Sequence, residues 1–311
     1  MNIFKTNAIL IVGLILSIFS CSPEGTTSNG GNGKLKVVTT TTMITDLAHE
    51  IGGDLILIDG LMGAGVDPHL FKATEGDVIK LSDADVIFYN GLHLEGKLED
   101  VFEKMNHNKD KTVALAACLD KSTLIGSANF ASNYDPHIWF DVHYWMKMSE
   151  YFTEKLSEKD PQNKASYANN LALYLAKLKA LDNNINKQIE SIDKSKRILV
   201  TAHDAFNYFG KLYGFQVVGL QGLSTATEAG VKDLQKLSEF IITNNVKSVF
   251  IESSVPRKTI EALQASVQSK GHEVSIGGTL YSDALGDKGT VEGTYIGMYE
   301  YNVRTIINSL R

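Results

Sequence analysis

The chain has 311 residues, of which 43% are hydrophobic, and a formal net charge of -6 at pH 7. A chain of this length can bury a sizeable core, and its length favours two lobes over one. The acidic balance and the lack of a basic patch interleaved with aromatic residues argue against nucleic acid as a partner. A mild acidic surplus is compatible with a cation as ligand.

The first 20 residues have the pattern of a secretion signal. After a positively charged start, residues 8–19 form an apolar run that is too short to cross a membrane. Cys21 follows as in a bacterial lipoprotein cleavage site, where the thiol takes a diacylglycerol; an ordinary signal peptide cut nearby is the alternative. We expect a signal peptide over 1–20 and a lipidated flexible tether over 21–34. With Cys21 acylated, Cys118 has no partner, so no disulfide is expected.

Strands alternate with helices in the first part of the chain. The expected elements are strands over 35–40, 55–58, 86–89 and 112–115, and helices over 43–51, 75–81 and 95–105. Such alternation is typical of βαβ units and a mainly parallel sheet. We expect an N-terminal α/β lobe over residues 35–160.

The middle of the chain predicts one long helix. No glycine or proline occurs between residues 162 and 192. Apolar residues recur there at steps of three and four, which draws one stripe along a helix: Leu171, Leu175, Leu178, Leu181, Ile185, Ile189 and Ile192. About thirty residues make a rod of about 45 Å, longer than one small lobe needs. We expect a linking helix over 161–193 that joins two lobes.

The alternation resumes after this helix. The expected elements are strands over 198–201, 216–220, 248–251 and 273–276, and helices over 205–213, 231–244, 256–270 and 293–310. They predict a C-terminal α/β lobe over 194–311. The fold class expected for the whole chain is α/β, with two sandwich-like lobes of mainly parallel sheets joined by one long helix.

The triplet Asp-Pro-His occurs twice, at residues 67–69 and 135–137, in a chain with 5 prolines and 8 histidines. Proline fixes its own φ and keeps the preceding residue out of the helical region, so each triplet is a stiff turn. Such a turn holds an imidazole, here His69 or His137, ready for a metal. A third imidazole, His203, directly follows a predicted strand, where α/β sheets place their ligands.

A carboxylate and further acidic residues complete the candidate set. Asp283 follows the last predicted strand after a glycine-containing loop, although by itself it is one polar loop residue among many. Metal-bound imidazoles usually donate their second N–H to a carboxylate or carbonyl. The neighbouring carboxylates could do this or could form turns and helix caps: Asp67, Asp135, Asp141 and Asp204. The remaining histidines are expected to be ordinary surface or core residues: His49, His93, His107, His143 and His272.

Several stretches, taken together and in order, resemble the cluster A-I solute-binding lipoproteins of ABC importers, the TroA-like manganese- and zinc-binding family. The matching stretches are residues 66–69, 89–95, 135–141, 201–209, 225–230, 282–286 and 293–295. The resemblance runs from Leu35 to the C-terminus. It implies a metal site of His69, His137, His203 and Asp283. One departure is Lys72, where the family often has Glu, and this alters an expected contact across the cleft.

The resemblance also implies a function without catalysis. The expected protein is exported, anchored to a membrane through lipid on Cys21, in the periplasm or on the surface of a bacterium. It captures zinc or manganese between the lobes and hands the ion to an ABC permease, and we expect a monomer. The candidate ligands divide two and two, with His69 and His137 before the stiff helix and His203 and Asp283 after it. We therefore expect a small tilt of the lobes rather than a wide closure.

The choice of metal has opposing cues. Three imidazoles suit zinc, whereas a carboxylate that binds through both oxygens permits the higher coordination of manganese. Family members with a carboxylate at the third ligand position tend to be manganese proteins, and this chain has His203 there. Zinc importers often carry a histidine-rich loop, yet residues 118–134 contain no histidine. Zn²⁺ and Mn²⁺ therefore both stay as candidate cargo.

Two other functions fit a three-histidine, one-aspartate site. A metal-dependent hydrolase keeps a position open for water beside a general base, and the chain has no His-Glu-x-x-His motif. A surface adhesin whose metal is structural predicts an unfolded apoprotein, whereas an importer component folds without metal and can be reloaded.

Overall fold

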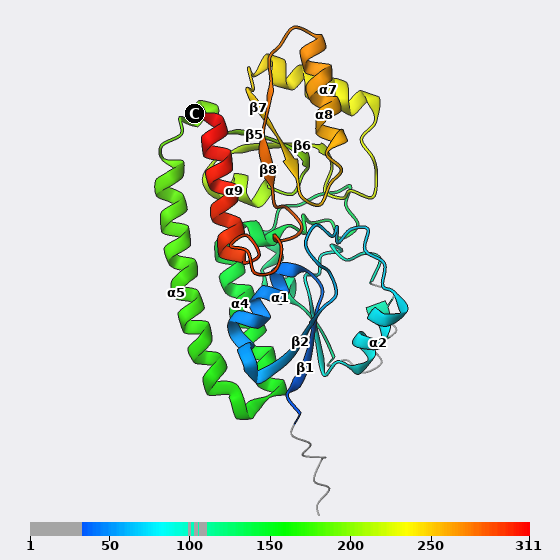
Figure 1. Cartoon of the computed structure of the whole chain (residues 1–311), viewed down its shortest axis with the longest axis vertical. Coiled ribbons are helices and arrows are strands. Elements are labelled where there is room, and N and C mark those ends of the chain that lie inside the picture. Colours follow the sequence, from blue (N-terminus) through cyan, green and yellow to red (C-terminus); the bar gives the residue numbers. More distant parts are fainter. Residues whose placement is uncertain (1–32, 99–100, 103–104, 106–110) are drawn as a thin grey trace, which may run out of the picture. The chain divides into compact units, whose positions relative to one another are not determined.

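The computed structural model describes residues 33–98, 101–102, 105 and 111–311, and Lys34–Arg311 forms one compact unit (Figure 1). The expected signal peptide, nearly all of the tether with Cys21, and part of the expected helix over 95–105 lie outside the described residues. Within the described part of the chain, no helix is long and apolar enough to cross a membrane. Cys118 is a free cysteine.

The first lobe contains a four-stranded parallel sheet in the order β2-β1-β3-β4. The strands are β1 (Leu35–Thr39), β2 (Ile56–Gly60), β3 (Val86–Tyr89) and β4 (Thr112–Ala114), and the helices that alternate with them are α1 (Thr42–Gly52) and α2 (Glu75–Asp83). Successive side chains of a strand point to opposite faces. Val37 accordingly packs in the core that contains α1, and Val38 in a second core with Leu81 of α2.

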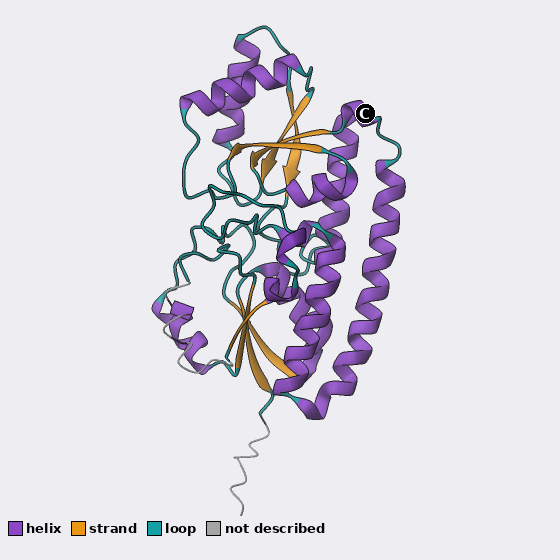
Figure 2. Cartoon of the chain, turned by 180° about the vertical axis from the view of Figure 1, so that it is seen from behind, coloured by secondary structure: helices purple, strands orange, loops and turns teal. Residues whose placement is uncertain are grey.

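Three helices pack against one another along one side of the molecule (Figure 2). They are α4 (Val142–Lys159), α5 (Lys164–Ile189) and α9 (Tyr295–Leu310). Helix α5 confirms the long helix expected from the sequence, and the C-terminal part of its apolar stripe, from Leu178 to Ile189, is buried. Helix α4 was not predicted from the sequence. Helix α9 packs against the strand that precedes it, β8 (Ser275–Leu280), and also against α5 and α1. The lobe boundaries expected from the sequence stay predictions.

The second lobe contains two pairs of parallel strands, β5-β6 and β7-β8, and β5 lies against β7. The strands are β5 (Ile198–His203), β6 (Gln216–Gln221), β7 (Ser248–Glu252) and β8 (Ser275–Leu280), and the helices are α6 (Asn207–Tyr213), α7 (Val231–Thr243) and α8 (Lys258–Ser269). These strands and helices confirm the α/β class with mainly parallel sheets.

One hydrophobic core continues from the first lobe into the second. Phe88 of β3, Phe140, Phe206 beside α6 and Phe250 of β7 belong to the same cluster of buried side chains. Phe140 packs against Phe206 with ring centroids 4.4 Å apart. Buried apolar contact of this kind resists separation of the lobes, which favours small relative movements.

Candidate metal centre

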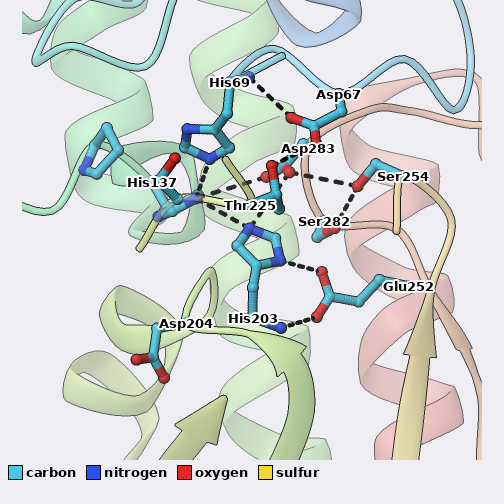
Figure 3. Close-up of polar contacts among 12 residues, drawn as sticks. Asp67, His69, His137, His203, Asp204, Thr225, Glu252, Ser254, Ser282 and Asp283 are labelled. Atoms are coloured by element: carbon cyan, nitrogen blue, oxygen red, sulfur yellow. Dashed lines mark hydrogen bonds and ion pairs between the residues drawn. The ribbon is translucent and has the colours of Figure 1, made fainter. Parts of the chain in front are cut away.

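Four segments from both lobes bring the candidate ligands together (Figure 3). His69 ends the first Asp-Pro-His turn, and His137 directly precedes a short 3-10 helix that leads to α4. His203 is the last residue of β5, and Asp283 lies three residues beyond β8. One ligand atom from each of the four lies within 4.8 Å of the others. The structure therefore places the four residues singled out in the sequence in one cluster.

His137 is at the centre of this cluster. Its Nε2 lies 3.3 Å from Nε2 of His69 and 3.3 Å from Nε2 of His203. Asp283 contributes Oδ1 at 3.6 Å from Nε2 of His137 and Oδ2 at 3.3 Å from Nε2 of His203. His69 is 5% exposed, and the other three side chains are 0–1% exposed. Three imidazole nitrogens of the same type and one carboxylate thus face a common, water-excluded point.

The two Asp-Pro-His turns are built alike. In each, the aspartate Oδ1 accepts a hydrogen bond from the backbone N–H of the histidine, at 2.8 Å for Asp67 and His69 and 2.9 Å for Asp135 and His137. Such a side-chain bond two residues ahead is an Asx turn. Because proline fixes the residue between, the local sequence alone sets the direction in which each imidazole leaves the backbone.

The outer oxygens of both aspartates contact the second lobe. Thr225 Oγ1 donates to Oδ2 of Asp67 at 2.5 Å. The side chain of Asn207 on α6 donates to Oδ2 of Asp135 at 3.0 Å. In each Asp-Pro-His turn, the aspartate therefore forms a hydrogen bond with a side chain of the second lobe.

Carboxylates also hold the second ring nitrogens of two of the imidazoles. Asp135 Oδ1 lies 2.8 Å from Nδ1 of His137, as the sequence analysis considered possible. For His203 the partner is Glu252 at the end of β7, whose Oε2 lies 2.6 Å from Nδ1, off the line of an ideal N–H···O bond. Glu252 was missed from the sequence because it lies 49 residues beyond His203.

The other acidic candidates do not contact an imidazole of the cluster. Asp204, although it follows His203 directly, turns away from it and accepts the backbone N–H of Gly219 at 2.6 Å (Figure 3). It therefore neither orients His203 nor caps the next helix. Asp141 caps α4 by accepting N–H groups of His143 and Tyr144.

Burial and charge set the protonation of the cluster. Burial lowers the pKa of His69 to about 3, so this imidazole is neutral at physiological pH. Burial also opposes the charged form of His203, but the carboxylates of Asp283 and Glu252 outweigh it and raise the pKa of His203 well above its ordinary value. Burial likewise opposes the charged form of Asp283, and the neighbouring His203 nevertheless lowers its pKa below the ordinary value.

The remaining histidines lie outside this cluster of ligand atoms, as far as the described residues show. His143 is 54% exposed beside Asp141 and Asp182. His272 faces the carbonyl of Val246 at 3.1 Å. Lys72, the departure from the family pattern, is exposed, and no described carboxylate forms an ion pair with it. His107 lies outside the described residues.

The donor set fits a divalent transition metal. Asp283 Oδ1 is buried and has no hydrogen-bond partner among the described residues, which is costly unless a ligand accompanies the group. Imidazole nitrogen and carboxylate oxygen are ligands for zinc, and a carboxylate with two available oxygens also suits manganese. Four protein ligands leave little space for a water nucleophile.

Two α/β lobes that share one long helix and bury a three-histidine, one-aspartate cluster between them define the class of metal-binding proteins of ABC importers. Comparison with known proteins agrees. The family model described as zinc-uptake complex component A, periplasmic, matches residues 37–309, and the chain belongs to this family. Relatives from streptococci are named as substrate-binding lipoproteins of ABC transporters.

Relatives named for different metals resemble the chain over most of its length. It is 44% identical to the manganese-binding lipoprotein MntA of Bacillus subtilis over 304 residues, covering 97% of this chain and 99% of the relative. It is also 44% identical to the zinc-binding protein TroA of Treponema pallidum over 286 residues, covering 92% of each. The solved structure of the periplasmic zinc-binding protein TroA from Treponema pallidum matches with a TM-score of 0.87 and 45% identity, covering 89% of this chain and 99% of that one.

Proposed function

We propose that this protein is an extracytoplasmic solute-binding protein that captures one zinc or manganese ion between its lobes and delivers it to an ABC permease. The observation that carries the proposal is the convergence of Nε2 of His69, His137 and His203 with the carboxylate of Asp283 at one buried point. These four residues are the metal ligands that we propose. Membership of a transport family supports capture over catalysis.

Capture depends on both lobes because the ligands come from both. His69 and His137 precede the long helix, and His203 and Asp283 follow it. An ion between them gains four bonds only when the lobes are close together, so its binding energy holds the cleft closed. The shared core and the single stiff helix α5 support a small tilt between the loaded and empty states rather than a wide opening.

Both ions suit the site for different reasons. Three imidazole ligands suit zinc, and a site of nitrogen and oxygen ligands has a higher intrinsic affinity for zinc than for manganese. Manganese gains from a carboxylate that presents two oxygens to the cluster. The relatives named for manganese and for zinc, each 44% identical to this chain, support a common site that accepts either ion.

The location and partners follow from the family. Relatives are named as lipoproteins, and Cys21 after an apolar run is the residue that we propose carries the lipid. The anchored protein would act as a monomer on the outer side of a membrane, in the periplasm or at the cell surface. It would release its ion when the permease separates ligands of one lobe from those of the other.

Calorimetric titration of metal-stripped chain 34–311, with zinc and with manganese separately, tests this function. We expect one tight site per chain and an apoprotein that is folded by near-ultraviolet circular dichroism. His137→Ala should weaken binding more than about 100-fold, because loss of an outer partner alone costs 10–100-fold. His143→Ala is the matched control and should bind normally. An unfolded apoprotein would favour a structural metal, and no binding of either ion would overturn the proposal.

A further inference from the structure

Glu252 makes both of its polar contacts to a single residue of the metal cluster. Oε1 accepts the backbone N–H of His203 at 2.8 Å, and Oε2 lies 2.6 Å from Nδ1 of the same residue. The glutamate is 2% exposed and stands at the end of β7, against the end of β5. Figure 3 shows both contacts from the one carboxylate.

No other charged group accounts for burying this carboxylate. Within the described residues, no lysine or arginine forms an ion pair with Glu252. Asp135, which stands beside His137, differs because its second oxygen accepts a hydrogen bond from Asn207. A buried carboxylate is costly unless it is paired. The pairing of Glu252 with His203 alone therefore indicates that the carboxylate is present for that histidine.

We propose that Glu252 is a positioning residue that keeps His203 available as a metal ligand, a proposal that rests on the function proposed above. A carboxylate accepts hydrogen bonds and donates none. Facing Nδ1, it holds one ring proton there, so that the proton displaced by an ion is the one on Nε2, whose lone pair then points into the cluster. Its negative charge also makes the imidazole a stronger donor to a cation. The hydrogen bond from the backbone N–H of His203 to Oε1 fixes the position of this residue at the end of β5.

Glutamine at this position would favour the proton on Nε2 of His203 rather than on Nδ1. The backbone N–H of His203 needs an acceptor, and of the two ends of the glutamine amide only the oxygen can accept in place of Oε1. The amide nitrogen then faces Nδ1 as a donor. Nδ1 must accept, so the proton of the neutral ring moves to Nε2, the atom that has to bind the metal. Glu252→Gln thus loses the charge and also favours the wrong tautomer.

Titration of metal-stripped chain 34–311 with zinc and with manganese tests this role. We expect Glu252→Gln to weaken binding of both ions by about 10–100-fold. Glu252→Asp keeps the charge and should recover part of the affinity. In the zinc-loaded protein, the proton on Nδ1 of His203 should give a low-field NMR resonance that moves upfield in Glu252→Gln. A role in folding alone would leave that resonance in place.

The matched control is Asp204→Asn. It removes a negative charge next to His203 in sequence, but from a carboxylate that bonds Gly219 and faces away from the ring. We expect this variant to bind both ions like the unsubstituted chain. If Glu252→Gln does not fold, the affinity and resonance of Glu252→Asp decide, and values identical to the unsubstituted chain overturn the role.

Two failures are distinguishable. If the unsubstituted chain binds neither ion, the proposed function is overturned and this inference with it. If the unsubstituted chain binds and Glu252→Gln binds equally well, or if Asp204→Asn loses as much affinity, the positioning role alone is overturned.

Discussion

Asn207 and Asp135 join the two lobes beside the metal cluster. The side-chain amide of Asn207, on the first turn of α6, donates to Oδ2 of Asp135 at 3.0 Å and to the carbonyl of Asp204 at 3.2 Å. The other oxygen of Asp135 holds Nδ1 of His137. A chain of polar contacts therefore runs from His137 in one lobe to the segment that carries His203 in the other.

Asn207→Ala should weaken zinc binding by about tenfold, because Asp135 loses the contact that holds it against α6 while its contact with His137 remains. Calorimetry on the metal-stripped protein measures this change. Asn170→Ala is the control, since its amide makes the same kind of bond to the carbonyl of Ile51 at 2.8 Å away from the site. Equal losses in both variants would show that Asn207 contributes only to general stability.

His203→Glu tests the relation between the third ligand and its outer partner. The substitution places two carboxylates in contact inside the protein, because Glu252 remains. We expect the apoprotein to lose about 3–5 kcal/mol of unfolding free energy, as when a buried charge has no partner. Combining it with Glu252→Gln should restore most of that stability and shift the ratio of affinities toward manganese, which prefers oxygen ligands.

Urea unfolding of the two single variants and the double variant gives the coupling energy between the sites. Additive losses would contradict a direct contact between the two side chains in the substituted protein. Titration of the double variant with each ion then gives the change in the ratio of zinc to manganese affinity. An unchanged ratio would contradict the role of His203 in setting the metal preference.

Metal binding should release protons and tighten as pH rises. In the unloaded protein, the raised pKa of His203 keeps a proton on the ring at neutral pH, whereas burial lowers the pKa of His69 to about 3 and leaves that ring neutral. Because an ion must displace the proton of His203, we expect release of about one proton per ion and a Kd that falls about tenfold for each pH unit near neutrality.

Calorimetry in buffers of different ionisation enthalpy counts the released protons directly. At any pH below its raised pKa, His203 carries a proton that competes with the ion. Lowering the pH therefore weakens metal binding. Binding without proton release at pH 7 would contradict the protonation state assigned to His203 in the empty site.

Gly219 on β6 leaves room for the end of β5. A Cβ at this position would lie 2.5 Å from the backbone N of Asp204 and 2.5 Å from the carbonyl carbon of His203. Gly219→Ala should therefore displace this segment, lower stability by about 1–3 kcal/mol and weaken metal binding. Thermal unfolding and titration measure both effects. Gly222→Ala is the control because a Cβ there meets no atom within 4 Å, and an equal effect in the control would contradict a steric cause.

Sequence patterns predicted the fold class and three of the four candidate ligands, His69, His137 and His203. Alternating strand and helix patterns act over a few residues, so they predicted the parallel sheets and the long helix α5. The two Asp-Pro-His turns are equally local, since proline and an Asx bond fix each of them within three residues. Asp283 depended on the family resemblance, because a single loop aspartate has no distinctive local pattern.

The partner of His203 depends on tertiary contacts, whereas Asp135 was already a candidate partner of His137 from the sequence. Strand order places β7 beside β5 and so brings Glu252 to His203 across 49 residues, a distance that no local pattern spans. Asp204, the neighbour in sequence, lies just beyond the end of β5 and accepts the backbone N–H of Gly219 instead. Local turns therefore fix the direction of two candidate ligands, His69 and His137, whereas packing between strands supplies the carboxylate that faces His203.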